Sequence, residues 1–147
     1  MASDPLRKVT AYITASRAGT RSLLVFEEEG YEHLGLQVPG GTVNEGESLD
    51  SAVLREIREE SGIGFAQIRA YLGEFPYVSE KLGTAIVRHY YWLELDEDCP
   101  DRFTHVVTSE DEDNGWVYHY RWEPLTAASP ALYAHLGRYL PHLPSRQ

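Results

Sequence analysis

Apolar side chains alternate with polar ones in several short stretches of the chain, and this spacing predicts β-strands. Within Val9–Ala15, the apolar residues Val9, Ala11 and Ile13 alternate with polar neighbours, as in a strand with one buried face. Leu23–Phe26 is a continuous apolar run, which is typical of a strand buried on both faces. The other predicted strands are Leu34–Val38, ended by Pro39 and Gly40-Gly41; Ile68–Leu72, ended by the turn-forming stretch Gly73–Pro76; Thr84–Leu95; and Trp116–Trp122.

A helical pattern covers the segment from about Ser48 to Ser61. Leu49, Val53 and Ile57 repeat at i, i+4 and i+8, so they form one apolar stripe along a helix. The serine at the start of the segment is a suitable N-cap, and the glycine at position 62 is well placed to end the helix.

A second helix is predicted near the C-terminus. The dipeptide Ser129-Pro130 combines an N-cap residue with a first-turn proline. Leu132, Leu136 and Leu140 then repeat at a spacing of four residues, and Pro141 ends the helix.

The order of these elements is strands, one helix, strands and one helix. This order predicts an α/β fold, a layered domain in which helices cover the faces of a mixed sheet. The chain has 147 residues and no internal repeat or linker, so we expect a single domain over residues 1–147. The hydrophobic fraction of 42% and the charged fraction of 24% exclude intrinsic disorder of the whole chain.

The chain is acidic, and its charge limits the ligands that it can bind directly. It has 13 Lys and Arg residues against 23 Asp and Glu residues, for a formal net charge of −10. An acidic surface repels nucleic acids and anionic membranes, so we expect neither as a general partner. The only two lysines are Lys8 and Lys81. If the substrate is an anion, cations must mediate much of the contact.

The compartment is expected to be the cytoplasm. Cys99 is the only cysteine, which excludes an intramolecular disulfide and a cysteine-rich zinc site. The N-terminus lacks the apolar core of a signal peptide, and no run approaches the ~18 apolar residues of a membrane span.

Acidic side chains gather on one face of the predicted helix at 48–61. At ~100° per residue, Glu56, Glu59 and Glu60 fall within one arc beside the apolar stripe. Arg55 can reach Glu59 at i, i+4, but one arginine cannot balance three carboxylates with Glu47 nearby. A hard divalent cation such as Mg²⁺ or Mn²⁺ is the natural complement, because both prefer oxygen ligands.

The glycines before this helix have a mechanical role. Gly40-Gly41 follows Pro39 and lets the backbone turn sharply and approach a ligand closely. Gly46 permits a second tight turn before the helix. A loop packed on the helix in this way can direct a backbone carbonyl towards the same cation.

Together, these residues resemble a known signature. Gly41–Ile63 resembles the Nudix box, GX5EX7REUXEEXGU with U aliphatic, and every defined position matches. Pro39-Gly40-Gly41 is similar to the usual approach to this box, and the element order resembles the Nudix α/β/α sandwich with a central mixed sheet. Asn44-Glu45 departs from the Glu-Pro of many relatives at positions without a catalytic role.

The resemblance implies hydrolysis of a nucleoside diphosphate linked to another group, with Mg²⁺ or Mn²⁺ as cofactor. Water would attack a phosphorus atom, and metal ions would neutralise the diphosphate and activate the water. By position, the resemblance implies metal binding by Glu56, Glu59, Glu60 and the Gly40 carbonyl, orientation by Arg55, and structural roles for Glu47, Gly41 and Gly62.

The general base is not fixed by the box. Within the family it is either a box glutamate or a carboxylate elsewhere, and Glu56 is the first choice here. Residues 94–113 hold nine acidic side chains, which are typical of a solvated loop. Two of them, Glu110 and Glu112, precede the strand predicted at 116–122 and are candidates for an additional ligand or the base.

The substrate stays open at the level of sequence. Pro76 and Tyr77 fall too early to match the markers that sort the family by substrate. We rank a nucleoside di- or triphosphate or a dinucleoside polyphosphate first and a nucleotide sugar or ADP-ribose second. A Nudix-like nucleotide sensor without turnover is the alternative from another class. Similar proteins are often dimers, so a homodimer is open.

Aromatic residues are frequent, and some are candidates for stacking on a nucleobase, although core packing is the simpler role for each. These candidates are Tyr71, Tyr77, Tyr90, Tyr91, Trp92 and Trp116.

Overall fold

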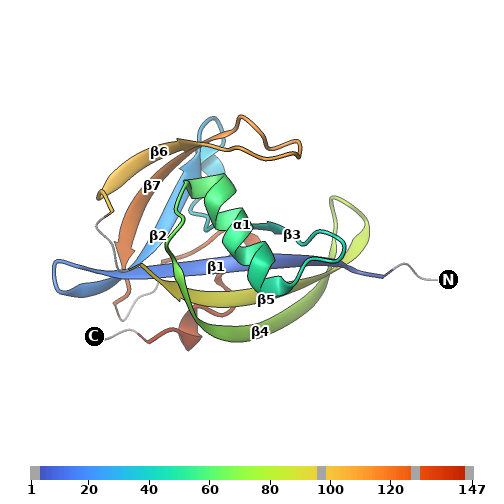
Figure 1. Cartoon of the computed structure of the whole chain (residues 1–147), viewed down its shortest axis with the longest axis horizontal. Helices are drawn as coiled ribbons and strands as arrows, with labels where there is room; N and C mark the ends of the chain where they lie inside the picture. Colours follow the sequence, from blue (N-terminus) through green and yellow to red (C-terminus); the bar gives the residue numbers. More distant parts are fainter. Residues whose placement is uncertain (1–3, 96–98, 127–129, 145–147) are drawn as a thin grey trace.

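A mixed β-sheet forms the centre of the molecule (Figure 1). The computed structural model describes residues 4–95, 99–126 and 130–144. Within these ranges, no helix has the length and apolar character needed to span a membrane. The elements are β1 (Leu6–Arg17), β2 (Thr20–Glu28), η1 (Glu32–Leu34), β3 (Gly40–Thr42), α1 (Leu49–Ser61), β4 (Gln67–Ser79), β5 (Thr84–Glu94), β6 (Arg102–Val106), β7 (Val117–Pro124), η2 (Ala134–Gly137) and η3 (Leu140–His142).

The sheet has seven strands in the order β4-β5-β1-β2-β7-β6, with β3 paired to β1 outside this path. The β1–β5 pair is parallel and places Lys8 beside Arg88, whereas the other pairs are antiparallel. One edge of β1 is shared between two partners: residues 8–10 pair with β3, and residues 14–17 pair with β2. The main cavity, described below, is lined by residues on both sides of this division.

Both faces of the sheet are covered, as the alternation in β1 predicts. On one face, Val9, Ala11 and Ile13 pack against the helix residues Val53 and Ile57. On the other face, a second apolar cluster is closed by the C-terminal segment. It joins Tyr12, Leu23, Val25 and Tyr90 of the sheet to Leu136, Leu140 and Leu143. The predicted α/β fold with a mixed sheet is therefore confirmed, although the second covering layer consists of 3-10 turns.

Strand β4 is longer than the sequence pattern predicts. The prediction ended it at Leu72, but the strand continues through Gly73–Pro76 to Ser79. Two register shifts, the second between Tyr71 and Gly73, absorb the irregular stretch. Because β4 is an edge strand, the missing N–H of proline does not break a ladder on both sides.

Two short regions also differ from the prediction. The stretch 34–38 is not a strand but follows η1 and makes only isolated bridges, between Gln37 and Phe26 and between Leu36 and Leu132. Strand β6 lies inside the acidic stretch that was predicted to be a loop. The alternation of apolar and polar residues in β6 is weak, but the strand forms at the edge of the sheet because it pairs with β7 along its whole length.

The predicted C-terminal α-helix is wrong. Pro130 to Pro141 contains the 3-10 helix η2 and the start of η3 instead, and the expected N-cap Ser129 lies outside the described residues. Core tyrosines anchor this segment to the sheet: the Tyr12 hydroxyl donates to the Leu136 carbonyl, and the Tyr90 hydroxyl donates to the His135 carbonyl, which also accepts from the Arg138 N–H three residues on. Pro141 also lacks the N–H that would donate to the Gly137 carbonyl in an α-helix.

We predict that this C-terminal segment contributes to the core in spite of its irregular backbone. Leu140 is 4% exposed, whereas Leu82 in the β4–β5 turn is 56% exposed. Leu140→Ala should lower the free energy of unfolding by about 2–5 kcal/mol, because it leaves a cavity in the second apolar cluster. Leu82→Ala should change it by less than about 0.5 kcal/mol. Urea unfolding of both variants tests this, and equal stabilities would contradict it.

Candidate active site

The ends of α1 are fixed by its capping residues, as predicted. The backbone N–H of Ser51 donates to the Ser48 side chain at 3.1 Å, which caps the N-terminus. Gly62 adopts a left-handed conformation with φ 78° and closes the C-terminus through a bond to the Arg58 carbonyl. The acidic residues of the helix are therefore held in one register against β3.

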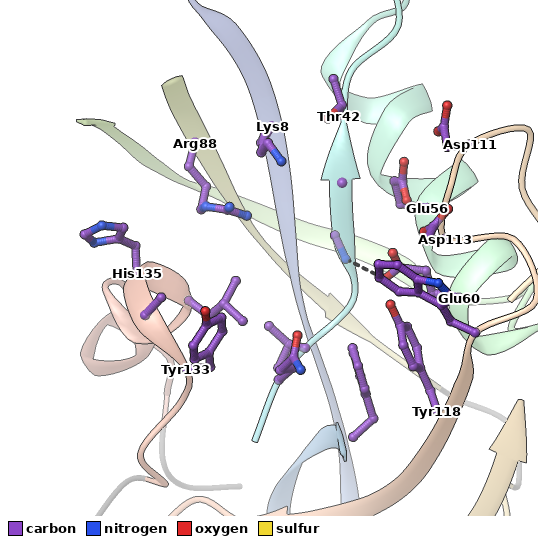
Figure 2. A pocket seen from close by; sticks show the side chains of 18 of the residues that line it. Lys8, Thr42, Glu56, Glu60, Arg88, Asp111, Asp113, Tyr118, Tyr133 and His135 are labelled. Carbon is purple, nitrogen blue, oxygen red and sulfur yellow. Dashed lines mark hydrogen bonds between the residues drawn. The ribbon is translucent and has the colours of Figure 1, made fainter. Parts of the chain in front are cut away.

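Two glutamates of α1 are buried against the β3 backbone. Glu56 and Glu60 are only 4% and 5% exposed. The Gly40 N–H donates to Glu60 Oε1 at 3.0 Å (Figure 2). A Cβ atom at Gly41 would lie 2.4 Å from the carboxyl carbon of Glu56, so only glycine leaves room for this carboxylate. The tight contact explains the glycine at the first box position.

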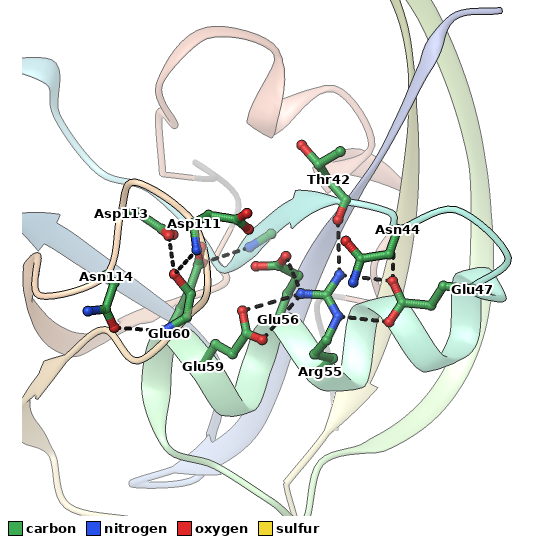
Figure 3. Close-up of polar contacts among 12 residues, drawn as sticks. Thr42, Asn44, Glu47, Arg55, Glu56, Glu59, Glu60, Asp111, Asp113 and Asn114 are labelled. Carbon is green, nitrogen blue, oxygen red and sulfur yellow. Dashed lines mark hydrogen bonds and ion pairs between the residues drawn. The ribbon is translucent and has the colours of Figure 1, made fainter.

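Arg55 joins the helix to the preceding loop (Figure 3). Its Nε and Nη2 atoms donate to the two carboxylate oxygens of Glu47 at 2.7 and 2.9 Å, a bidentate pair. Nη1 donates to Glu56 at 2.8 Å and to Glu59 at 3.3 Å, and Nη2 also reaches the Thr42 carbonyl at 3.0 Å. The hydrogen bond to Glu47 is the main cause that raises the pKa of Arg55 and lowers that of Glu47.

The site carries more negative charge than Arg55 can balance. Burial raises the pKa of Glu56 to about 7, even though the hydrogen bond from Arg55 acts in the opposite direction. Burial also raises the pKa of Glu60 well above its usual value, and the neighbouring Glu56 adds to this shift. Both ionised carboxylates therefore need a further positive charge beside them.

The donor set fits Mg²⁺ or Mn²⁺. Its groups are carboxylates and backbone carbonyls, the hard oxygen ligands that these ions prefer. Among the described residues, no three acidic, His or Cys side chains converge into a preformed metal site. Arg55 draws Glu56 and Glu59 towards itself, while Glu60 bonds to the Gly40 backbone. The carboxylates are gathered, but they are bonded to protein groups.

The loop between β6 and β7 brings further carboxylates to this cluster. It is docked on the end of α1, because the Thr108 N–H donates to the Glu59 carbonyl at 3.1 Å. Asp113 lies close enough to raise the pKa of both Glu56 and Glu60. Figure 3 shows Asp111 and Asp113 above the acidic face of α1.

Of the two loop carboxylates predicted from sequence, one lines the main cavity and the other does not. Glu112 does line the main cavity, together with Asp111 and Asp113. Glu110 instead lines a second, smaller cavity beside Arg55 and outside the main one. The sequence gives no indication that Asp113 lies at the site, because the turn that returns the loop to α1 is set by tertiary contacts.

A cavity of about 660 Å³ opens beside the acidic cluster. Glu56 and Glu60 form one wall, and Lys8, Arg88 and the C-terminal segment around His135 form another (Figure 2). Of the aromatic candidates, only Tyr77 and Trp116 line the cavity. Tyr90 and Tyr91 belong to the core, Trp92 packs against it, and Tyr71 lies on β4 in contact with His89.

The sequence profile described as "NUDIX domain" matches residues 5–143. The chain belongs to the Nudix family. Membership indicates a hydrolase that acts on nucleoside diphosphate derivatives. The contacts described above show how the Nudix box is used in this chain, with its glycine, arginine and glutamates in one connected cluster.

Solved structures agree with this fold. The MutT NUDIX hydrolase from Burkholderia pseudomallei matches with a TM-score of 0.66 and 23% identity, over 97% of this chain and 100% of that chain. The NUDIX domain of Shewanella oneidensis NrtR, complexed with ADP ribose, matches with a TM-score of 0.66 and 20% identity, over 92% and 84%. The C. elegans Ap4A hydrolase matches with a TM-score of 0.57 and 22% identity, over 83% and 82%. No curated protein matches the chain.

We predict that the buried glutamates of the Nudix box, Glu56 and Glu60, lower the stability of the metal-free protein. Glu60→Gln removes a buried charge beside Glu56 but keeps an acceptor for the Gly40 N–H. In a chelating buffer, this variant should raise the free energy of unfolding by about 1 kcal/mol or more. Glu45→Gln changes an exposed carboxylate in the same box and should have an effect below about 0.5 kcal/mol. Urea unfolding measures both, and a Glu60→Gln protein less stable than the wild type would refute the prediction.

Proposed function

We propose that this Nudix protein is a Mg²⁺- or Mn²⁺-dependent hydrolase that cleaves the diphosphate linkage of a nucleoside diphosphate derivative. The observation that carries the proposal is the buried, undercompensated carboxylate cluster in the wall of a cavity of about 660 Å³. A sensor without turnover has no need for such a costly cluster, and every carboxylate of the box is present.

The roles proposed for the individual residues come from the Nudix resemblance and are supported by their contacts. Glu56, Glu59, Glu60 and the Gly40 carbonyl would hold the cation. When bound, Mg²⁺ or Mn²⁺ would neutralise the diphosphate and lower the pKa of the attacking water. Arg55 orients Glu56 and Glu59 through Nη1. The three glutamates come from adjacent turns of one capped helix, so their spacing is preset.

Glu47 acts at a distance from the reacting atoms. Its bidentate pair with Arg55 fixes the guanidinium, and its Oε1 accepts from the Asn44 N–H at 2.9 Å. Gly41 leaves space for the Glu56 carboxylate, and Gly62 ends the helix where the β6–β7 loop packs against it.

For the general base we propose Glu56. Its carboxylate lines the cavity beside Glu60, and in the metal-free chain burial raises its pKa to about 7. The carboxylate would accept a proton from the water that attacks phosphorus. Glu112, on the cavity wall, is the second candidate, and Glu110 lies outside this cavity. Asp113 is a third candidate, because it lies near Glu56 and Glu60.

The preferred substrates are nucleoside triphosphates and dinucleoside polyphosphates. Structures with the same fold include the C. elegans Ap4A hydrolase and the E. coli dihydroneopterin triphosphate pyrophosphohydrolase. The runner-up class is a nucleotide sugar or ADP-ribose, supported by the NrtR domain complexed with ADP ribose and by a UDP-X diphosphatase.

We predict metal-dependent hydrolysis that depends on Glu60. Wild type is incubated with Mg²⁺ or Mn²⁺ and a nucleoside triphosphate, a dinucleoside polyphosphate or a nucleotide sugar, and the nucleotide products are separated and quantified by anion-exchange chromatography. Glu60→Gln should lower kcat/KM by about a hundredfold or more. Glu45→Gln should retain the wild-type rate, because Glu45 is exposed.

Two outcomes would contradict this proposal. Equal rates for wild type and Glu60→Gln would show that hydrolysis does not depend on the glutamates of the Nudix box. Tight nucleotide binding without any product over hours would favour the sensor.

A methyl group at Gly41 should displace the Glu56 carboxylate. Gly41→Ala is expected to weaken Mn²⁺ binding, measured by calorimetry, by about tenfold or more. The added Cβ meets the end of a flexible side chain, so the fold should be retained. Gly64→Ala is the matched control, since a Cβ there meets nothing within 4 Å. Unchanged Mn²⁺ affinity in Gly41→Ala would argue against Glu56 as a ligand.

A further inference from the structure

Two cations lie side by side on the cavity wall that faces the acidic cluster. Lys8 of β1 and Arg88 of β5 are register partners in the parallel strand pair, and both line the cavity. Figure 2 shows the Lys8 amino group and the Arg88 guanidinium on the side of β3 away from Glu56 and Glu60. We call Lys8 and Arg88 the cation pair.

Arg88 is held in place by neutral groups. Its Nη1 donates to Thr10 Oγ1 at 2.9 Å, and its Nε and Nη2 donate to the Tyr77 hydroxyl at 3.2 and 2.9 Å. These bonds orient the guanidinium but leave its charge uncompensated. In contrast, Arg55, Arg69 and Arg121 each contact at least one carboxylate.

Neither member of the cation pair has a carboxylate within ion-pair distance among the described residues. Lys8 is half-buried, and burial together with Arg88 lowers its pKa despite attraction from Glu56 and Glu60. Two like charges placed together at partial burial are unfavourable without an anion. In a chain of net charge −10, this arrangement is not a consequence of surplus positive charge.

The cation pair and the acidic cluster lie on opposite sides of β3. Gly41 contacts Glu56, and Thr42 is the register partner of Lys8. Adjacent strands lie about 5 Å apart, so the backbones of Lys8 and Arg88 are about 5 and 10 Å from that of β3. The cavity therefore presents a cation-binding wall and, one to two strand spacings away, an anion-binding wall.

We propose that Lys8 and Arg88 bind a phosphate group beyond the diphosphate that is cleaved, so that the site selects substrates with three or more linked phosphates. The inference rests on the proposed function, because it assumes that the cleaved linkage lies at the acidic cluster. A nucleoside triphosphate or a dinucleoside polyphosphate supplies a charged phosphate at this distance. In a nucleoside diphosphate sugar, an uncharged sugar would lie against the two cations instead.

The kinetic test compares kcat/KM for a dinucleoside polyphosphate and a nucleoside diphosphate sugar. Lys8→Gln should lower kcat/KM for the polyphosphate about tenfold or more and change it less than about twofold for the sugar nucleotide. Lys8→Arg keeps the charge and should restore most of the loss. Arg102→Gln removes a positive charge from β6, at the far edge of the sheet and outside the cavity lining, and should leave both values within about twofold.

A binding test does not depend on turnover. Inorganic tripolyphosphate is titrated at low ionic strength into the full chain in a chelating buffer, and binding is followed by backbone amide NMR shifts. Signals of Thr10 and Arg88 should shift in the wild type and in Arg102→Gln, and Lys8→Gln should bind about tenfold more weakly. Pyrophosphate should bind more weakly than tripolyphosphate.

The two tests separate the two hypotheses. A wild type that hydrolyses nothing but binds tripolyphosphate through Lys8 would overturn the proposed function and support the cation pair as a phosphate site. Hydrolysis with the same substrate preference in Lys8→Gln would overturn the cation pair and leave the hydrolase intact. Tripolyphosphate affinity equal in wild type and Lys8→Gln, or no binding to either, would also overturn it.

Discussion

The arrangement of the site depends on two buried glutamates, Glu56 and Glu60, that share one side of a short helix with a single arginine. The apolar stripe of α1 packs on the sheet, so the adjacent carboxylates are carried into a region with little solvent. Arg55 contacts four groups, but its one charge cannot balance the cluster. The packing that stabilises the fold thus creates the electrostatic deficit on which the proposed chemistry depends.

The helix and its acidic face could be predicted from sequence because their causes are local. Capping by Ser48 and Gly62, the apolar stripe and the spacing of the glutamates all operate within a few turns. The two-sided burial of Leu23–Phe26 was equally clear, since a continuous apolar run needs a covered sheet. The i, i+4 spacing predicted that Arg55 can reach Glu59, and the two side chains are bonded at 3.3 Å.

The remaining features depend on distant parts of the chain. The spacing of Leu132, Leu136 and Leu140 is helical, but the segment forms 3-10 turns, two of whose carbonyls are bonded to hydroxyl groups of β1 and β5. Asp113 reaches the site only because the β6–β7 loop is tied to the end of α1. The cation pair arises from a parallel pairing of strands 80 positions apart in sequence, which no local pattern specifies.

The irregular C-terminal segment has an evolutionary consequence. Residues 133–136 form part of the cavity rim and are attached to the sheet mainly through the hydroxyls of Tyr12 and Tyr90 and through a bond to the Leu36 carbonyl. The reactive wall comes from a different part of the chain, the loop and helix at 40–60. Replacement of a few residues near the chain end can therefore reshape this rim of the cavity while the Nudix box on the opposite wall is inherited unchanged.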